Sequence, residues 1–260
     1  MDRVKLGIQS YTCRDYMQTA EDMDKALAYI ADFGCRVIQL SGIGPIEQSD
    51  VTRLVKKYDM DVCVTHKDFG RMRTDIDKLI DEHIDMDCDC IGLGCMPSEY
   101  SRDEAGVRRF AADVAPIASR IRERGLRFAY HTHDFEFIKL EDGRTLLDVM
   151  LETTDPDTFW FTPDAGWAQI AGCDPNEFLR KLKGRIKVAH FKDYCFENGK
   201  RRFIEIGKGL VDYKKVYETC EEIGVPYAVF EQDCDWSQDA LTSCRESFAE
   251  MKKIAAEVDG

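Results

Sequence analysis

Four stretches of the chain end an apolar run with a side chain that can bind a metal ion. They are FAYHTHDFEF at 128–137, WFTPDAGW at 160–167, IKVAHFKDY at 186–194 and YAVFEQD at 227–233. Each run is typical of a buried strand, and His131, Asp164, His190 and Glu231 fall where that strand would stop. If the strands are parallel and close into a barrel, their carboxyl ends share one rim, and these side chains converge.

Two imidazoles and two carboxylates form a ligand set for a divalent metal ion. We expect Mn²⁺, with Mg²⁺, Co²⁺ or Zn²⁺ as alternatives. A buried ion pair would also explain Asp164 and Glu231, and a hydrogen-bonded core histidine would explain His190. Four metal-capable residues at four strand ends favour the metal site over these separate explanations.

The segment HTHDFE offers several candidates within a few residues. Side chains two apart on a strand share a face, so Ala129 and His131 point the same way. If Ala129 faces the barrel axis, His131 is the ligand, and His133 follows in a loop over the substrate as a candidate catalytic residue. Glu136 is either the ligand of this strand or a proton-transfer group, and the sequence favours neither option.

Other polar and aromatic residues stand at or near the predicted strand ends. Lys192 follows His190 and is a catalytic candidate that could hold a substrate oxygen, although an ion pair with Asp193 is the alternative. An amide and a neutral imidazole suit substrate hydroxyl groups, and indole rings suit the apolar faces of sugars. The candidate substrate-binding residues are therefore Gln9, His66, Trp167 and Trp236.

The elements that must position these residues alternate along the chain. Apolar runs predict strands at 4–9, 36–40, 61–66, 90–94, 126–131, 159–164, 186–190 and 227–231. Helical periodicity predicts helices near 20–34, 49–58, 74–86, 102–124, 144–152, 174–183, 212–223 and 240–257. The alternation predicts a (β/α)₈ TIM barrel, with one domain over residues 1–260. The longer connection CFENGKRRFIEIGKGLVDY is expected to form an elaborated loop at the barrel mouth.

Composition restricts the classes of partner. The net charge of −13 opposes binding to nucleic acid, and no apolar run is long enough to cross a membrane. The start of the chain lacks the pattern of a secretory signal, and several of the 11 cysteines lie in or beside apolar runs. We therefore expect a cytoplasmic protein with free thiols, including Cys88 and Cys90, and a small-molecule substrate. A homo-oligomer is compatible with the sequence.

Specific motifs in this sequence resemble those of a known superfamily over essentially the whole chain. They are YHTHDFEF, AHFKD, IGKGLVDY and FEQD. The chain resembles the sugar phosphate isomerase/epimerase superfamily of xylose isomerase-like TIM barrels, which includes the family-2 AP endonucleases. Related epimerases hold a divalent metal with Glu, Asp, His and Glu from strands five to eight. Asp164, His190 and Glu231 match that set, whereas His131 stands where a glutamate is usual.

The resemblance implies a reaction type. A proton is removed from the carbon next to a carbonyl, an enediolate forms, and reprotonation gives an isomer or epimer. Expulsion of a β-substituent would instead give a dehydratase or lyase acting on an inosose or a 3-keto-glycoside. Two departures put the substrate in question, because Trp167 replaces a substrate-binding histidine and Gln39 replaces an acidic residue. Phosphodiester hydrolysis and a non-catalytic carbohydrate-binding barrel are the remaining alternatives.

Overall fold

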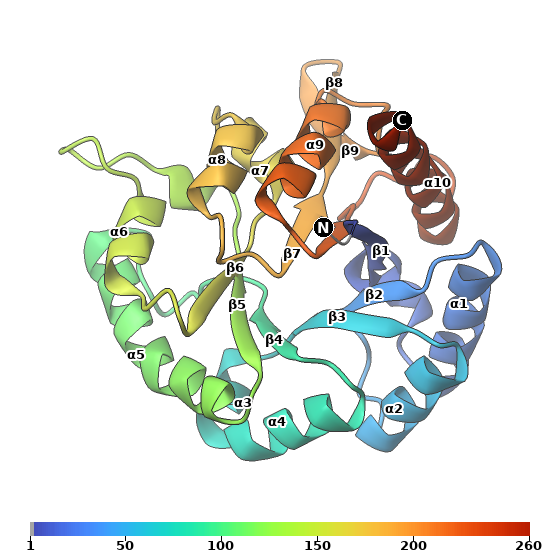
Figure 1. Cartoon of the computed structure of the whole chain (residues 1–260), viewed down its shortest axis with the longest axis horizontal. Helices are drawn as coiled ribbons and strands as arrows, with labels where there is room; N and C mark the ends of the chain where they lie inside the picture. The colour runs from blue at the N-terminus through green and yellow to red at the C-terminus, as the bar shows by residue number, and fades with distance from the viewer. Residues whose placement is uncertain (1–2) are drawn as a thin grey trace.

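The computed structural model describes residues 3–260 and forms a parallel barrel surrounded by helices (Figure 1). The barrel strands run in the order β6-β5-β4-β3-β2-β1-β10-β7, so β10 is the eighth strand of the barrel. They are β1 (Lys5–Gln9), β2 (Val37–Leu40), β3 (Asp61–His66), β4 (Cys90–Leu93), β5 (Arg127–His131), β6 (Phe159–Thr162), β7 (Val188–Phe191) and β10 (Tyr227–Phe230). The predicted (β/α)₈ barrel is confirmed.

The barrel closes between β6 and β7 by isolated bridges rather than by a continuous ladder. The bridges pair Phe161 with Ile186 and Asp164 with His190. The His190 N–H donates to the Pro163 carbonyl over 2.8 Å at the mouth end of this seam. Two of the predicted metal ligands therefore face each other across the join of the barrel.

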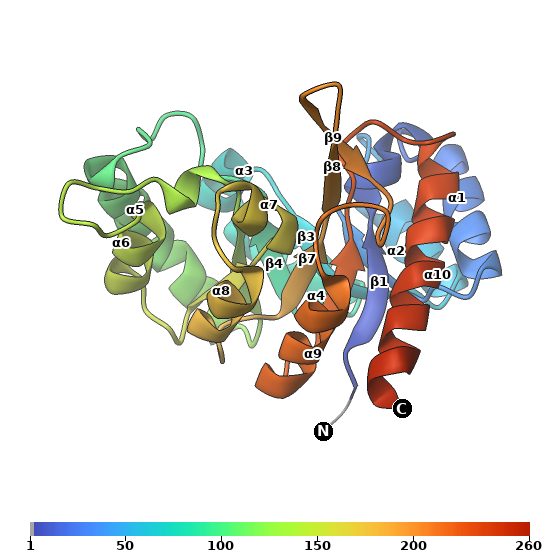
Figure 2. The ribbon, with the colours of Figure 1, turned by 90° about the horizontal axis from the view of Figure 1, so that it is seen from above.

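Helices surround the sheet (Figure 2). They are α1 (Ala20–Asp32), α2 (Gln48–Lys57), α3 (Phe69–Thr74), α4 (Ile76–Asp85), α5 (Glu104–Glu123), α6 (Leu146–Thr153), α7 (Ala165–Ile170), α8 (Pro175–Lys181), α9 (Tyr213–Ile223) and α10 (Ala240–Asp259), with 3₁₀ turns η1 (Ser10–Tyr16) and η2 (Phe135–Phe137). Gly34 and Gly224 end α1 and α9 with φ of +84° and +77°, a left-handed conformation that glycine adopts without steric cost.

Two short helices and a hairpin were not expected as such from the sequence. The short helices α3 and α7 follow β3 and β6 directly, and neither is long enough to show an apolar period. The connection after β7 forms an antiparallel hairpin of β8 (Asp193–Glu197) and β9 (Lys200–Ile204). In Figure 2 this hairpin projects from the end of the barrel opposite the N-terminus, so the elaborated mouth loop is confirmed.

Small and branched side chains fill the barrel axis, whereas a larger apolar layer lies between the sheet and the helices. The inner cluster consists of Val37, Cys63, Val64, Cys90, Ala129, Val188 and Val229. Because Ala129 is a member, strand alternation turns His131 toward the same axis, as expected. All 11 cysteines are free thiols, and Cys88 and Cys90 are buried.

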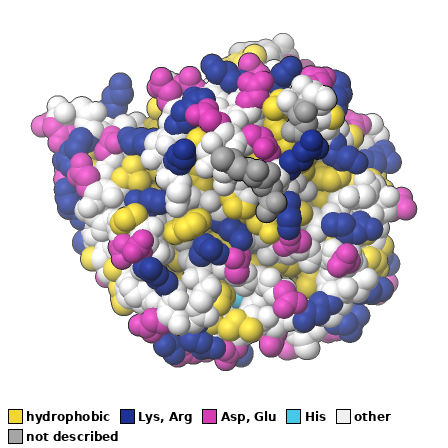
Figure 3. Space-filling view, viewed as in Figure 1, with side chains coloured by type: hydrophobic (Ala, Val, Ile, Leu, Met, Phe, Trp, Pro, Cys, Tyr) yellow, Lys and Arg dark blue, Asp and Glu magenta, His cyan; other side chains and the backbone are white. Residues whose placement is uncertain are grey.

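The surface shown in Figure 3 carries both signs of charge in alternation. Lysine and arginine side chains are interleaved with aspartate and glutamate over this face, without a basic stripe. None of the helices described over residues 3–260 is long and apolar enough to cross a bilayer.

Candidate metal centre and active site

His131, Asp164, His190 and Glu231 meet at the carboxyl ends of the strands. Each offers one ligand atom, these atoms all lie within 4.8 Å of one another, and all four residues are buried. His131 ends β5, Asp164 follows β6 and caps the start of α7, His190 lies in β7, and Glu231 follows β10. Residues up to 100 positions apart in the sequence thus form one compact group, because neighbouring parallel strands end at the same rim.

The hydrogen bonds of the two imidazoles orient their lone pairs toward this group. His131 Nδ1 lies 3.2 Å from the Thr162 carbonyl, which can only accept, so Nδ1 carries the hydrogen and Nε2 is left as a ligand atom. His190 Nε2 lies 2.8 Å from Gln39 Oε1, which likewise assigns the hydrogen to Nε2. His190 Nδ1 then faces Glu231 Oε2 across 2.8 Å, a contact between two acceptors unless a proton or a cation lies there.

The carboxylate of Asp164 is only partly satisfied by the residues around it, because the Lys192 ammonium stays 3.6 Å from its Oδ2. Its Oδ1 accepts the Trp167 N–H over 2.9 Å at the start of α7, but its buried Oδ2 has no hydrogen-bond partner among the residues described. Burial raises the pKa of this carboxyl to about 7, although Lys192 and His190 oppose the rise. An orphaned carboxylate oxygen, two oriented imidazoles and a second carboxylate fit a divalent ion.

Lys192 is a fully buried lysine beside this group. Its Nζ lies 2.8 Å from Asp233 Oδ2, 3.2 Å from Glu231 Oε2 and 3.6 Å from Asp164 Oδ2. Burial would lower the pKa of Lys192, but these carboxylates outweigh burial and raise it. The same ammonium, with His190, holds the pKa of Glu231 well below its usual range despite burial. Lys192 is therefore charged, and its partner is Asp233 rather than Asp193.

The backbone around Lys192 is tightly packed. The Tyr213 hydroxyl donates to the Lys192 carbonyl over 2.7 Å. A Cβ at Gly166 would approach that same carbonyl oxygen to 2.0 Å, so only glycine fits in α7 at this point. Helix α7 and β7 therefore fix the position from which the lysine side chain enters the site.

A chain of hydrogen bonds supports His190 from behind. The Gln39 amide links two histidines, because its Oε1 accepts from His190 Nε2 and its Nε2 donates to His66 Nε2 over 2.8 Å. His66 then carries its hydrogen on Nδ1, which lies 3.4 Å from Ser41 Oγ. Burial lowers the pKa of His66 to about 3, so His66 is neutral at pH 7. Such outer partners fix the tautomer of a metal-binding histidine.

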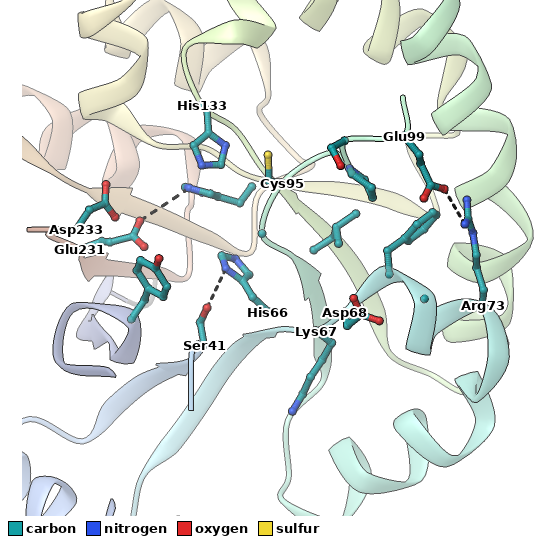
Figure 4. Close-up of a pocket in the computed structure, with 18 of the residues that line it drawn as sticks. Ser41, His66, Lys67, Asp68, Arg73, Cys95, Glu99, His133, Glu231 and Asp233 are labelled. Atoms are coloured by element: carbon teal, nitrogen blue, oxygen red, sulfur yellow. Dashed lines mark hydrogen bonds and ion pairs between the residues drawn. The ribbon is translucent and has the colours of Figure 1, made fainter. Parts of the chain in front are cut away.

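The candidate metal-binding group of His131, Asp164, His190 and Glu231 opens, through His131 and Glu231, into a cavity of ≈ 870 Å³ (Figure 4). One half is lined by polar residues of the site, namely Tyr11, Ser41, His66, His131, His133, Lys192, Glu231 and Asp233. Of the candidates for proton transfer, His133 lines this cavity, and its buried Nδ1 has no hydrogen-bond partner within the described part of the chain. Burial lowers the pKa of His133 to about 4, which leaves the imidazole neutral.

Glu136 belongs neither to the metal-binding group nor to the cavity lining. Its Oε1 accepts the Tyr130 hydroxyl over 2.5 Å, and its Oε2 accepts the backbone N–H of His133 over 2.8 Å. Burial raises the pKa of this carboxyl to about 7. The expectation that Glu136 acts as a ligand or a base stays a prediction; in this structure the carboxylate holds the loop that carries His133.

The remaining sequence candidates differ in whether they line the cavity. Gln9, Trp167 and Trp236 are absent from the residues that line the large cavity, whereas His66 is present. The amide Nε2 of Gln9 and both indole N–H groups are nevertheless buried without a partner in the described structure. The Lys192 ammonium lies 5.1 Å from the Trp167 ring centroid, so this indole packs behind the lysine.

Asp193 organises the loop that follows the hairpin. Its carboxylate accepts hydrogen bonds of 2.9–3.2 Å from the backbone N–H groups of Tyr194, Gly207, Gly209 and Val211. A Cβ at Gly209 would approach its Oδ1 to 2.1 Å. The motif IGKGLVDY thus forms a fixed rim beside the site.

Two residues with clear contacts at the site were missed as site members. Asp233 binds Lys192, and its position two residues after Glu231 was a usable signal, because such residues share a side of an extended chain. Ser41 follows the second strand as the other candidates follow theirs, but a single serine there carries no distinctive pattern.

Comparisons with known proteins agree with this fold. The family model of the xylose isomerase-like TIM barrel matches residues 58–254. A sugar phosphate isomerase/epimerase structure from Parabacteroides distasonis superimposes with a TM-score of 0.82 at 20% identity, covering 98% of this chain and 96% of that one. A xylose isomerase-like TIM barrel from Mycobacterium smegmatis in complex with magnesium gives a TM-score of 0.75 at 14% identity, with both chains covered completely.

Inosose dehydratase from Lacticaseibacillus casei is 28% identical over 131 residues. That match spans 45% of this chain and 43% of the relative, less than half the length of either protein. The solved structures support the fold, and the family model extends over most of the chain. The chain belongs to the xylose isomerase-like TIM barrel family.

Proposed function

We propose that this protein is a divalent-metal-dependent sugar isomerase or epimerase that removes a proton from the carbon next to a carbonyl. The observation that carries the proposal is the buried group of His131, Asp164, His190 and Glu231, which opens into a cavity together with a neutral, unpartnered histidine. We propose Mn²⁺ as its resident ion, since mixed nitrogen and carboxylate ligands suit it. When bound, the ion supplies positive charge beside the carbonyl oxygen, which lowers the cost of removing the neighbouring proton.

The side chains around the group have separate roles in this proposal. His133 takes the proton on its imidazole, because the ring lines the cavity and is neutral. Lys192, held by Asp233, offers its ammonium to a substrate oxygen that gains negative charge. Glu136 holds the backbone of His133 in place and touches no substrate. His66 contacts a substrate hydroxyl from the opposite wall, while Gln9, Trp167 and Trp236 shape the site from behind.

Proton exchange with solvent tests the function. The Mn²⁺-loaded protein is incubated with a panel of ketoses and inososes in D₂O, and ¹H NMR follows the C–H next to each carbonyl. We expect at least one substrate to lose that signal, and His133→Gln to abolish the loss while keeping its metal. Glu136→Gln is the matched control, expected to retain exchange in part. Turnover without deuterium uptake would exclude this chemistry, and full exchange by His133→Gln would exclude His133 as the base.

The second candidate is β-elimination, the dehydratase or lyase reaction. The partial match to inosose dehydratases favours it, since those relatives are dehydratases by name. The same first proton transfer serves both reactions, and they separate only in the fate of the β-substituent. Appearance of an α,β-unsaturated ketone, detected by its ultraviolet absorbance, would assign elimination, whereas an epimer of unchanged mass would assign epimerisation.

A further inference from the structure

The large cavity extends well beyond the metal-binding group. Figure 4 shows His133, Glu231 and Asp233 at one side of the cavity and Arg73 with Glu99 at the other. Both sets line the same space of ≈ 870 Å³. A single hexose has about 12 heavy atoms, and even at the ~30 Å³ that a liquid water molecule occupies, it would fill less than about 360 Å³. More than half of the cavity is left for another part of the ligand.

The distant half of the cavity has a different chemistry from the metal half. We call it the distal pocket and define it by Phe69, Arg73, Leu93, Pro97 and Glu99. Phe69 and Leu93 are buried apolar side chains of the core that also line this space. The guanidinium carbon of Arg73 lies 4.3 Å from the centroid of the Phe69 ring, so a planar cation covers an aromatic ring in this wall.

The charge of Arg73 is already compensated. Its Nη1 lies 2.7 Å from Glu99 Oε1, its Nη2 lies 3.6 Å from Asp113 Oδ2, and its Nη2 also donates to the Tyr100 hydroxyl. An arginine with two carboxylates does not demand an anionic ligand. The wall therefore suits a neutral, flat, largely apolar group, which gains from contact with the guanidinium plane that the Phe69 ring supports from below.

Gly94 lines the cavity beside His66. A Cβ at this position would approach His66 Nδ1 to 2.9 Å, so a larger residue would displace the histidine that the Gln39 amide holds. One continuous cavity therefore joins the metal half to the distal pocket.

We propose that the distal pocket binds a neutral aromatic ring attached to the reacting sugar, so that the substrate is a keto-glycoside, whose ring ketone supplies the carbonyl, with a flat aglycone rather than a free monosaccharide. This inference rests on the proposed function, because it takes the sugar to lie at the metal-binding group. It assigns substrate preference to Arg73 and Phe69, which contact none of the proposed metal ligands.

Binding of unreactive glycosides tests the distal pocket separately from catalysis. Calorimetry compares phenyl β-D-glucopyranoside with methyl β-D-glucopyranoside on the Mn²⁺-loaded full chain. We expect the phenyl glycoside to bind about tenfold more tightly or better, because its ring adds apolar and stacking contact. Arg73→Ala and Phe69→Leu should each reduce that preference several-fold while leaving the methyl glycoside unchanged.

Arg120→Ala is the matched control. Arg120 also pairs with two carboxylates, Asp77 at 2.8 Å and Glu123 at 3.0 Å, but it is not part of the cavity lining. It should keep the full phenyl preference. If Phe69→Leu does not fold, Arg73→Ala still tests the distal pocket, because Arg73 is exposed and its replacement should not disturb the core. Equal binding of the two glycosides, or an undiminished preference in Arg73→Ala, would overturn the distal pocket and leave the proton-exchange result intact. Absence of binding by both glycosides, together with no proton exchange, would instead remove the proposed function.

Discussion

Replacing Lys192 with methionine should destabilise the metal-free protein and increase its response to metal. The Lys192 ammonium neutralises buried carboxylates at 2.8, 3.2 and 3.6 Å, and without it Asp164 and Glu231 keep only histidines as compensation. At an effective dielectric constant of about 20, a pair of charges 3.2 Å apart interacts by about 5 kcal/mol. Much of that energy offsets the cost of burying the lysine itself.

The net loss is therefore smaller than the Coulomb sum. Breaking a buried ion pair by removing one partner costs roughly 3–5 kcal/mol. At roughly 2–4 °C per kcal/mol for a chain near this size, the midpoint of thermal unfolding should fall by roughly 6–20 °C in the presence of a chelator. A divalent ion supplies the missing positive charge, and methionine removes a like charge beside it. Metal should therefore raise the midpoint of Lys192→Met more than that of the native protein.

Thermal unfolding of both proteins, with chelator and with Mn²⁺, measures this difference. Lys187→Met is the matched control, since Lys187 is also mostly buried and pairs with Asp89 over 2.9 Å, before β7 and away from the mouth. Its loss of stability should not depend on metal. An equal response to metal in the native protein and in Lys192→Met would refute the argument that lysine and ion share the same carboxylates.

Further substitutions test the site and the structure that supports it. Asp164→Asn and Glu231→Gln should each lose most of the bound metal in elemental analysis of protein purified without chelator, whereas Glu136→Gln should keep its metal. Full metal content in the first two variants would refute the proposed ligand set. Gln39→Leu should weaken metal affinity about 10–100-fold in chelator competition, because His190 Nε2 loses its hydrogen-bond acceptor. Gln39→Glu keeps an acceptor oxygen and should retain the metal affinity. Burial alone would raise the pKa of Glu205, but hydrogen bonds from Ser243 and Ser237 outweigh burial and lower this pKa from 4.5 to about 2. The ionised carboxylate therefore stabilises the fold fully above pH 4.5. This stabilisation is lost as the pH falls toward about 2. Denaturant unfolding of Glu205→Gln should accordingly show a loss of about 3 kcal/mol at pH 7 that shrinks as pH falls from 4.5 toward 2, and a loss independent of pH would contradict the assignment.

The barrel and its ligand group could be predicted because both follow from local patterns. Eight apolar runs with polar ends define the strands, and strand alternation from Ala129 selects His131. The position of Glu136 could not be predicted in this way. The chain turns into η2 after His133, and the hydrogen bond from Tyr130, which points to the opposite side of β5, draws the carboxylate away from the cavity. The alternation of side chains along β5 predicts their direction only as far as the strand extends, and Glu136 lies beyond its end.

The partners of Lys192 were equally out of reach of the sequence. Its neighbour Asp193 looked like the obvious counter-ion, but four backbone N–H groups of the following loop occupy that carboxylate. The lysine instead turns to Asp233, 41 residues later, because β7 and β10 are adjacent in the barrel. Contacts between strands distant in sequence depend on barrel closure, which no local pattern records.

The closure between β6 and β7 has a consequence for the motions of the protein. Since isolated bridges rather than a full ladder join these strands, we expect the barrel to open locally between β6 and β7 before it opens elsewhere. Asp164 and His190 stand on its two sides and are both members of the ligand group. An ion bound by both Asp164 and His190 would hold β6 and β7 together. Amide hydrogen exchange at Phe161 and His190 should therefore slow when the ion binds. Metal binding by Asp164 and His190 and the closure of the barrel between β6 and β7 would then depend on the same contacts.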